Sequence, residues 1–172
     1  MIILETKRLS IRPMTQADLY FVYDYLKDPE TMKFFVEGPY TVEKVKEMIN
    51  RNKKDPIRYI VQKKDTSEII GHISLTHWFM RDTYELGFIF KREFHRQGFG
   101  TEAAQKVLEY AFEKLKAHRV VATCQPENIA SKRLIERLKM NQEGHFKKCI
   151  YYKDNIWWDE DFYSLLEEDY FI

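Results

Sequence analysis

Residues 85–103 read ELGFIFKREFHRQGFGTEA and join a predicted strand to a predicted helix. The run 83–90 is rich in aromatic and branched apolar residues, which is typical of a strand. A polar segment follows it and ends at Gly98 and Gly100. Beyond these glycines a helix is predicted to about Ala117, because apolar residues recur there at helical spacing. Its predicted core-facing residues are Ala104, Val107, Leu108, Ala111 and Leu115.

Upstream of this stretch, the pattern predicts one strand and two helices. Residues 9–12 alternate between apolar and polar side chains, as a short strand does. Thr15 is a good N-cap for a helix that ends before Asp28-Pro29. Thr41 caps a second helix, which Asp55-Pro56 ends.

Three strand-like runs come next, at 58–63, 69–76 and 83–90. The segments between them, 65–67 and Arg81-Asp82, consist of turn-forming residues. Because short turns join antiparallel strands, we expect the three strands to be antiparallel neighbours.

The last third of the chain predicts a buried strand at 120–124, a helix at 128–138 and a long hairpin at 146–166 broken by Asp154-Asn155. The acidic run at 167–169 is expected to be a solvated terminus. This order of elements predicts a single mixed α+β domain over residues 1–172. The apolar stripe of the helix at 128–138 is expected to be Ala130, Leu134 and Leu138.

Length and composition exclude several classes of protein. A domain of 172 residues buries about 70% of the surface of its unfolded chain, so it needs no disulfide or metal to build a core. Lys and Arg number 28 against 27 Asp and Glu, so net charge does not direct the chain to nucleic acid or a membrane. Cys124 and Cys149 form no CxxC pair, which favours reduced thiols and no metal site. No signal-peptide or membrane-spanning run is visible, and we expect a cytoplasmic protein.

The basic loop that enters the helix through Gly98 and Gly100 could hold a pyrophosphate. Helix starts leave backbone N–H groups unpaired and carry partial positive charge, and glycines let the backbone approach an anion closely. Arg92, His95 and Arg96 could add charge. The alternative is a glycine turn that only joins a strand to a helix, with a solvated basic flank.

The same residues also match the dinucleotide fingerprint G-x-G-x-x-A at Gly98, Gly100 and Ala103. That fingerprint should follow directly on the strand of an opening βαβ unit, with an acidic residue about 20 positions later. Here seven residues separate Phe90 from Gly98, and no acid stands at the tip of the next strand. An NAD-binding oxidoreductase is therefore disfavoured.

Three short runs together resemble the GNAT acetyltransferase superfamily: ELGFIF at 85–90, QGFGTEA at 97–103 and NIAS at 128–131. The narrower resemblance is to the branch of ribosomal-protein alanine N-acetyltransferases, and the segments 143–144 and 157–166 also fit it. The resemblance extends from about residue 9 to about residue 166. It implies a single domain with a mixed, mostly antiparallel, twisted sheet flanked by helices.

The resemblance also implies acetyl-CoA as the co-substrate. The backbone of Phe88, Ile89 and Phe90 would hydrogen-bond the pantetheine arm, and the sheet would open between 83–90 and 120–124 to admit it. His95 stands where the family usually has Gln or Arg, which should matter little because backbone amides do most of the binding. The cofactor loop is implied to be His95, Arg96, Gln97, Gly98, Phe99, Gly100 and Thr101.

Attack on a thioester needs a neutral amine, whereas an alkylamine with a pKa of about 10 is mostly charged at neutral pH. Glu85 is the leading candidate for the group that takes the proton, because it lies on the side of Gly87, where a side chain is missing. The alternative is an edge or surface glutamate. His72 and His77 are other candidate bases, although a lone histidine in a strand is more often structural or exposed.

The helix at 128–138 carries the residues implied to assist the leaving thiolate. Many family members have a tyrosine there, whose position is Ile135 here, and the related branch uses a serine that maps to Ser131. Asn128 would either contact the pantetheine amide or the acceptor, or cap the helix; capping explains Ser131 less well. Lys139 replaces the usual glycine at the helix end, so it must adopt a left-handed conformation or end the helix differently.

The sequence thus predicts an N-acetyltransferase that moves acetyl from acetyl-CoA to a primary amine, either a protein N-terminus or a small amine. The predicted mechanism is direct attack in a ternary complex with Glu85 and Ser131 as catalytic residues, and Cys124 keeps a ping-pong route open. No metal, nucleic acid or membrane partner is expected, and a homodimer is left open. The missing tyrosine and the substitution at His95 make a catalytically silent acyl-CoA-binding module the alternative.

Overall fold

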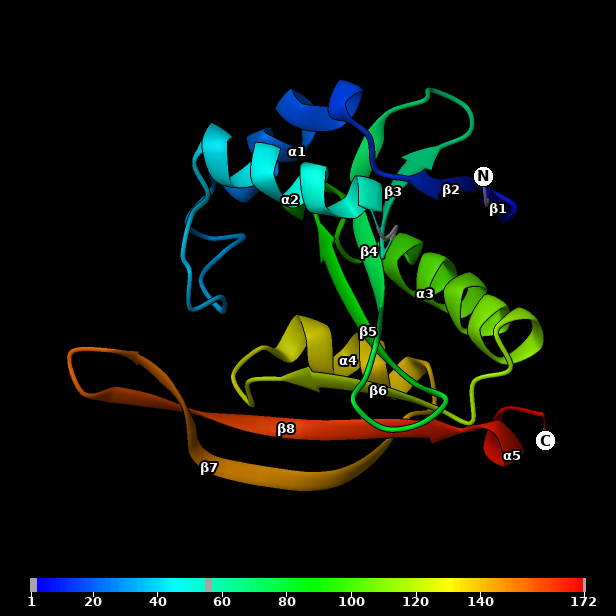
Figure 1. The fold of residues 1–172 in the computed structure, drawn as a ribbon, viewed down its shortest axis with the longest axis vertical. Coiled ribbons are helices and arrows are strands. Elements are labelled where there is room, and N and C mark those ends of the chain that lie inside the picture. Colours follow the sequence, from blue (N-terminus) through cyan, green and yellow to red (C-terminus); the bar gives the residue numbers. More distant parts are fainter. Residues whose placement is uncertain (1–2, 55–56, 172) are drawn as a thin grey trace. The chain divides into compact units, whose positions relative to one another are not determined.

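The computed structural model describes residues 3–54 and 57–171, in which eight strands form a sheet accompanied by five helices (Figure 1). The strand order is β1-β2-β3-β4-β5-β6-β8-β7, with one parallel pair, β5 and β6, among antiparallel pairs. The fold is therefore the mixed, mostly antiparallel α+β arrangement that was predicted. The elements are β1 (Leu4–Glu5), β2 (Leu9–Pro13), α1 (Leu19–Leu26), α2 (Val42–Lys54), β3 (Arg58–Lys63), β4 (Ile69–His77), β5 (Thr83–Phe90), α3 (Phe99–Glu109), β6 (Arg119–Cys124), α4 (Ile129–Arg137), β7 (Asn141–Lys153), β8 (Ile156–Leu166) and α5 (Glu167–Tyr170).

The chain divides into two compact units. The first contains the described residues up to Leu75 together with Phe88–Lys106, and the second contains Thr76–Gly87 together with the described residues from Val107 onward. Strands β4 and β5 and helix α3 run from one unit into the other. That residues 1–172 act as one acetyltransferase domain stays a prediction.

The first unit has a core between its helices and strands β3 and β4. Thr15 and Asp18 form the predicted capping box before α1, and Asp18 also accepts two hydrogen bonds from Arg12. The Thr41 hydroxyl accepts the N–H of Lys44 at the start of α2, as predicted. The predicted helix stop at 55–56 lies outside the described residues. The buried residues of this core are Met14, Val22, Tyr25, Leu26, Met32, Val45, Ile49, Ile60 and Ile69.

Strand β4 contains a bulge beside a glycine that touches β5. The register shifts between Val61 and Gln62, which leaves one extra residue in β4. Next to it, Gly71 has a φ of +157°, and an ideal Cβ there would lie 2.8 Å from the Cα of Phe90 and closer still to the carbonyl oxygen of Ile89. The absence of a side chain at Gly71 therefore lets the end of β5 lie directly against β4.

In the second unit, the first half of β5 pairs with β6 in parallel. The register pairs are Thr83 with Arg119, Tyr84 with Val120 and Glu85 with Val121. In the part of the chain that the structure describes, this ladder ends at Glu85, although β6 continues to Cys124 and pairs there with β8. The ladder thus ends where the resemblance implies that the sheet opens, and the presence of a pantetheine arm there stays a prediction.

The β7–β8 hairpin is the longest pairing of the second unit, and Figure 1 shows its two strands side by side. The predicted break at Asp154-Asn155 is the turn, and both residues have positive φ, 48° and 60°, as a tight hairpin turn requires. The hairpin was predicted to begin at Phe146, but β7 begins at Asn141. A register shift between Gln142 and Gly144 interrupts the alternation that would have marked the earlier start.

Other predicted boundaries were wrong for identifiable reasons. Strand β1 was missed because two residues carry no periodicity. The helix predicted to about Ala117 is α-helical only to Glu109 and continues as a π-helical segment over Tyr110–Lys114, so Leu115 lies beyond it and is half-buried. The 167–169 run forms part of the short helix α5, which was not predicted, although Glu168 and Asp169 are exposed as expected, and Tyr170 stacks on Phe112 with ring centroids 4.7 Å apart.

The apolar stripe predicted on α4 was right at Leu138, which is buried, and wrong at Ala130. Ala130 is exposed and Leu134 is only partly buried, whereas Ile135 is completely buried. Two successive steps of four residues rotate by about 80° around a helix of 3.6 residues per turn, so the predicted stripe turns from solvent at Ala130 toward the core at Leu138. Within the described residues, no helix has the length and apolar character that crossing a bilayer requires.

The close approach at Gly71 predicts a large effect of a single methyl group. Gly71→Ala should lower the free energy of unfolding by about 3 kcal/mol, because β5 must move away from β4. Gly38→Ala is the control: Gly38 has a φ of +60° but nothing within 4 Å of an ideal Cβ, so only the left-handed conformation costs, about 1 kcal/mol. Urea unfolding of both variants measures the difference, and equal losses would contradict the close approach.

Candidate active site

The end of β5 presents three residues predicted to hold the pantetheine arm. Phe88 and Phe90 lie on the same side of the strand with ring centroids 6.5 Å apart, and Phe90 is buried. Ile89 packs at the edge of the first core. His95 reaches back to this strand, and its Nε2 lies 3.0 Å from the carbonyl oxygen of Phe90. A carbonyl oxygen only accepts hydrogen bonds, so Nε2 is the protonated nitrogen of His95. His95 therefore connects the predicted pyrophosphate loop to the end of β5.

The loop at 95–98 turns sharply into α3. Arg96 has a φ of 62° and Gly98 a φ of 80°, so two of its residues are left-handed. Left-handed residues in such loops turn backbone N–H groups to one side and create concavities for anions. The first N–H groups of α3 have no acceptor inside the helix and add partial positive charge. The loop therefore has the backbone chemistry that a pyrophosphate requires.

The structure adds a residue that the sequence reasoning missed, Arg8. Its Nε lies 2.6 Å from the Glu102 carboxylate in the first turn of α3, and its Nη1 donates to the carbonyl oxygen of Gln97 at 3.1 Å. Burial opposes ionisation of Glu102, but hydrogen bonds from Thr6 and Arg8 hold its pKa below the usual value. No local pattern marks this cluster, because its contacts join residues that lie 89 to 96 positions apart in the sequence.

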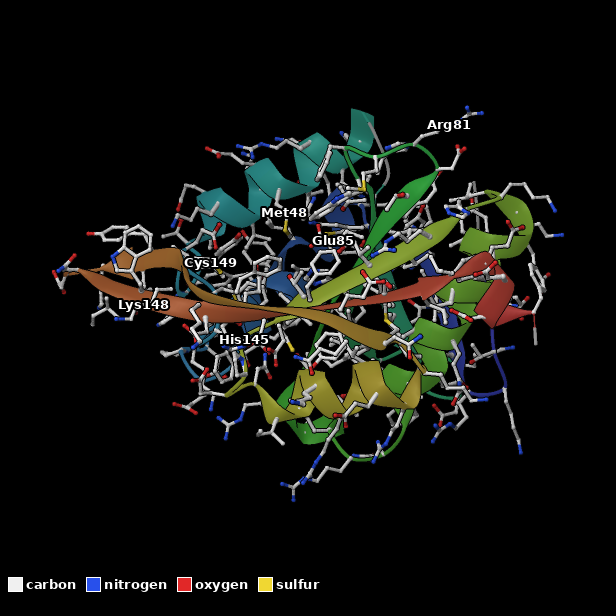
Figure 2. All side chains as sticks on the ribbon, turned by 90° about the horizontal axis from the view of Figure 1, so that it is seen from below. Met48, Arg81, Glu85, His145, Lys148 and Cys149 are labelled. Carbon is white, nitrogen blue, oxygen red and sulfur yellow. The ribbon has the colours of Figure 1, made fainter. Side chains whose placement is uncertain are left out.

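Glu85 lies on the paired part of β5 in the second unit and is partly buried (Figure 2). No hydrogen bond or ion pair with another described residue involves its carboxylate. Burial raises the pKa of Glu85, and the negative charge of Glu160 on β8 raises it further. A carboxylate with a raised pKa holds a proton more readily than a surface glutamate does, which suits a general base. Glu160 was not predicted, because the pairing of distant strands determines its position.

Helix α4 begins with Asn128 as its N-cap. The Asn128 Oδ1 accepts the backbone N–H of Ser131 at 3.2 Å, so the capping reading of Asn128 is confirmed. This bond uses the side-chain oxygen and leaves the NH₂ group for another partner. The hydroxyl of Ser131 has no hydrogen-bond partner among the described residues, and the residue is half-buried.

The two departures from the family pattern in α4 have plain structural explanations. Ile135 is completely buried, so an apolar side chain packs where many family members carry a tyrosine. Lys139 has a φ of 59°, which confirms that it takes the left-handed conformation usually given to glycine at a helix end. Its N–H donates to the carbonyl oxygen of Glu136 and closes the helix.

Cys124 ends β6 and pairs in register with Asp161 of β8. Burial raises the pKa of Cys124 to about 11, and the charge of Asp161 adds to the effect. The thiol is therefore protonated at neutral pH and is a weak nucleophile. This property argues against an acetyl-cysteine route through Cys124.

His145 lies between two carboxylates on the β7–β8 hairpin (Figure 2). Its Nδ1 is 2.8 Å from Asp161, and its Nε2 is 3.1 Å from Asp159. The hydrogen bond to Asp161 raises the pKa of His145 most, and the charge of Asp159 adds to it. Asp161 is almost completely buried and also lies 3.8 Å from the Nζ of Lys132.

The two histidines considered as bases have other roles. His72 is buried, and its Nδ1 lies 2.7 Å from the hydroxyl of Tyr25 in the first core. Burial lowers the pKa of His72 to about 3, so it is neutral and structural. His77 is exposed, and its Nδ1 lies 2.7 Å from the carbonyl oxygen of the adjacent Trp78.

The predicted site residues are divided between the two units. Phe88, Ile89 and Phe90 and the loop 95–101 belong to the first unit, where His95 joins them. Glu85, Asn128 and Ser131 belong to the second. Across residues 3–54 and 57–171, the structure contains no cluster of three or more His, Cys, Asp or Glu side chains that could hold a metal ion.

Comparison with known proteins gives a family match over most of the chain. Residues 8–141 match a family model described as Acetyltransferase (GNAT) domain. The chain is 44% identical over 166 residues to the uncharacterized N-acetyltransferase YnaD of Bacillus subtilis strain 168, which covers 96% of this chain and 97% of YnaD.

Solved structures give the same picture. The crystal structure of a GNAT-family acetyltransferase from Bacillus anthracis matches with a TM-score of 0.92 and 38% identity, over 97% of this chain and 99% of that one. The spermidine N-acetyltransferase of Vibrio cholerae, solved with CoA and spermine, matches with a TM-score of 0.85 and 22% identity, over 97% of this chain and 100% of that one. At this identity the second likeness shows the fold alone.

The position of His145 predicts a pH-dependent contribution to stability. Because the folded-state pKa is raised above the unfolded value of about 6.5, the stabilisation is complete below that pH and is lost as the pH rises through the folded pKa. The Tm difference between the wild type and His145→Gln should therefore be larger at about pH 5.5 than at about pH 8.5. A thermal unfolding series measures it, and a constant difference would contradict the ionic role of His145.

Proposed function

Because the chain belongs to the GNAT acetyltransferase family, we propose that it transfers acetyl from acetyl-CoA to a primary amine by direct attack in a ternary complex. The family makes it an acetyl-CoA-dependent acyltransferase. The observation that carries the proposal is the match over residues 8–141, because this range contains the loop, Glu85, Asn128 and Ser131. The amine acceptor, the mechanism and the residue roles are the proposed part.

The loop supports the binding of a pyrophosphate. Gly98 is left-handed, α3 begins directly after it, and unpaired N–H groups at a helix start suit phosphate oxygens. The loop 95–101 would hold the pyrophosphate, and the backbone of Phe88, Ile89 and Phe90 would hold the pantetheine arm. When bound, acetyl-CoA supplies a thioester whose carbonyl carbon is open to attack.

Glu85 is the proposed base. A protonated amine has no lone pair with which to attack, so a group or a water molecule must first take its proton. The carboxylate of Glu85 is partly buried, has no ion-pair partner among the described residues and has a raised pKa. These properties suit a carboxylate that accepts a proton, directly or through water, and they are unlike those of a solvated surface glutamate.

Ser131 is the proposed partner of the leaving thiolate. Its hydroxyl has no acceptor among the described residues, so it is available to donate a hydrogen bond to sulfur. The NH₂ group of Asn128 is available for an amide carbonyl of the pantetheine arm or for the acceptor, because capping uses only the oxygen. Ile135 cannot donate a proton, which leaves this task to Ser131 or to water.

The narrower features of the proposal rest on resemblance alone. A role in acetylating ribosomal protein N-termini and assembly as a homodimer both stay predictions. Proteins of one fold accept very different amines, so the fold does not select the acceptor.

The release of free thiol from acetyl-CoA tests the function. The wild type is incubated with acetyl-CoA and, one at a time, with peptides with free N-termini, polyamines, amino acids and aminoglycosides. An N-acetyltransferase releases thiol only when an accepted amine is present, and the product carries the acetyl group on nitrogen. Binding of CoA without release for any amine would instead favour the catalytically silent module.

Replacing Glu85 tests the base. Glu85→Gln keeps the shape of the side chain but cannot accept a proton, so kcat/KM should fall by about 10²-fold or more while CoA affinity is unchanged. Raising the pH should recover part of the loss, because more of the amine is already neutral. Initial rates between about pH 6 and about pH 9 measure the effect. Wild-type rates across this range would show that the proton leaves by another route.

Glu160→Gln is the matched control for Glu85. It removes the negative charge that raises the pKa of Glu85 and leaves the proposed base intact. The rate in the alkaline range should be retained, while the acidic limb of the kcat/KM profile should shift to lower pH. A loss of rate at every pH would assign Glu160 a direct role.

Replacing Ser131 tests the assistance to the thiolate. Ser131→Ala should lower kcat by about 10²-fold and leave the KM for acetyl-CoA nearly unchanged. The change should not weaken the helix cap, because alanine keeps the backbone N–H that Asn128 accepts. Steady-state kinetics and a Tm measurement separate the two effects. An unchanged kcat would make the hydroxyl a feature of the helix only.

A further inference from the structure

Arg8 connects three parts of the first unit. Its Nε and its backbone N–H both reach the carboxylate of Glu102, at 2.6 and 3.0 Å, and Thr6 donates a third hydrogen bond to the same group at 2.5 Å. The opposite edge of the guanidinium donates from Nη1 to the carbonyl oxygen of Gln97 at 3.1 Å. Arg8 thus ties the start of β2 both to the first turn of α3 and to the loop before it.

The bond to Gln97 determines the direction of a neighbouring N–H. The carbonyl of Gln97 and the N–H of Gly98 belong to one peptide unit, and no peptide bond in the described residues is cis. In a planar trans peptide these two groups point in opposite directions. Because Arg8 holds the carbonyl on its own side, the N–H of Gly98 must point to the other side of the loop.

Two further distances place the guanidinium of Arg8 beside Gly98 and Phe99. The guanidinium carbon lies 4.3 Å from the centre of the Phe99 ring, which is a cation–π contact. Nη2 lies 3.4 Å from the position of an ideal Cβ on Gly98. One side chain therefore contacts Gln97 and Phe99, the residues on either side of Gly98, at the point where the left-handed turn becomes a helix.

We infer that Arg8 is a positioning residue for the pyrophosphate loop and acts from behind it. It holds the N–H of Gly98 in the direction in which a phosphate oxygen can accept from it. The inference rests on the proposed binding of acetyl-CoA. Nη1 donates to Gln97 and Nε pairs with Glu102, so the role inferred for Arg8 runs through the peptide between Gln97 and Gly98.

Preorganised donors bind an anion more tightly than donors that must first be ordered. Loss of the contact to Gln97 should therefore lower the affinity for CoA by about tenfold, the size expected for one charge-assisted hydrogen bond. Binding of the pantetheine arm does not use this loop. The same change should leave pantetheine, which has no phosphate, unaffected.

The test measures the binding of CoA, 3′-dephospho-CoA and pantetheine to the wild type, Arg8→Gln and Arg8→Lys by calorimetry. Arg8→Gln should weaken CoA and dephospho-CoA equally, by about tenfold, and raise the KM for acetyl-CoA with little change in kcat. Arg8→Lys can still pair with Glu102 but cannot also hold Gln97. It should recover the Tm of the wild type without recovering the affinity for CoA.

Arg12→Gln is the matched control. Arg12 also makes a bidentate ion pair in the first unit, with the carboxylate of Asp18 at 2.9 and 2.7 Å. Its loss should lower the Tm and leave CoA binding unchanged. The inference is overturned if Arg12→Gln weakens CoA as much as Arg8→Gln, if Arg8→Lys binds CoA normally, or if pantetheine is equally affected. The inference is also overturned if Arg8→Gln lowers the affinity for CoA but not for 3′-dephospho-CoA, because Arg8 would then contact the 3′-phosphate. A wild type that binds no CoA would instead remove the proposed function, and the inference with it.

Discussion

The parallel pairing of β5 with β6 is the constraint on which the arrangement of the site depends. Parallel strands cannot be joined by a hairpin, so the chain must leave the end of β5, return through a crossover helix and enter β6 in the same direction. Helix α3 is that crossover, and its start therefore follows soon after the end of β5. This requirement brings the loop at 95–98 and the last residues of β5 into one neighbourhood, where His95 joins them. The proposed phosphate site is a consequence of strand direction.

Local patterns predicted most of the fold. The bounds of β3 and β5 are those expected from the sequence, and the turn at Asp154-Asn155 was recognised from turn chemistry. The errors occurred where distant pairing overrides local pattern. The start of β7 was missed because a register shift between Gln142 and Gly144 interrupts its alternation, and the periodicity of α4 did not indicate the complete burial of Ile135. The candidate site divides in the same way. The loop and Glu85 could be identified from motifs, whereas Arg8 and Glu160 act through partners that the sequence places far away.

Burial in the second unit affects two ionisable groups with opposite consequences for chemistry. It raises the pKa of Glu85 and of Cys124, and the negative charge of Glu160 contributes to both shifts. For a carboxylate, a higher pKa brings its basicity closer to the pH at which the protein works. For a thiol, the same change keeps it protonated and unreactive. One electrostatic environment thus favours proton transfer through Glu85 and disfavours covalent catalysis through Cys124, which agrees with direct transfer.

The cluster of Thr6, Arg8 and Glu102 has a consequence for biosynthesis. Arg8 and Glu102 are 94 residues apart, so a ribosome that adds about 5–20 residues per second makes Glu102 roughly 5 to 20 s after Arg8. During that interval Arg8 has no charge partner, because Glu102 has not yet been synthesised. The contacts that Arg8 makes to the loop at 95–98 and to Glu102 therefore cannot form while only the first half of the chain has been made. The loop can reach its final conformation only after the start of α3 has left the ribosome.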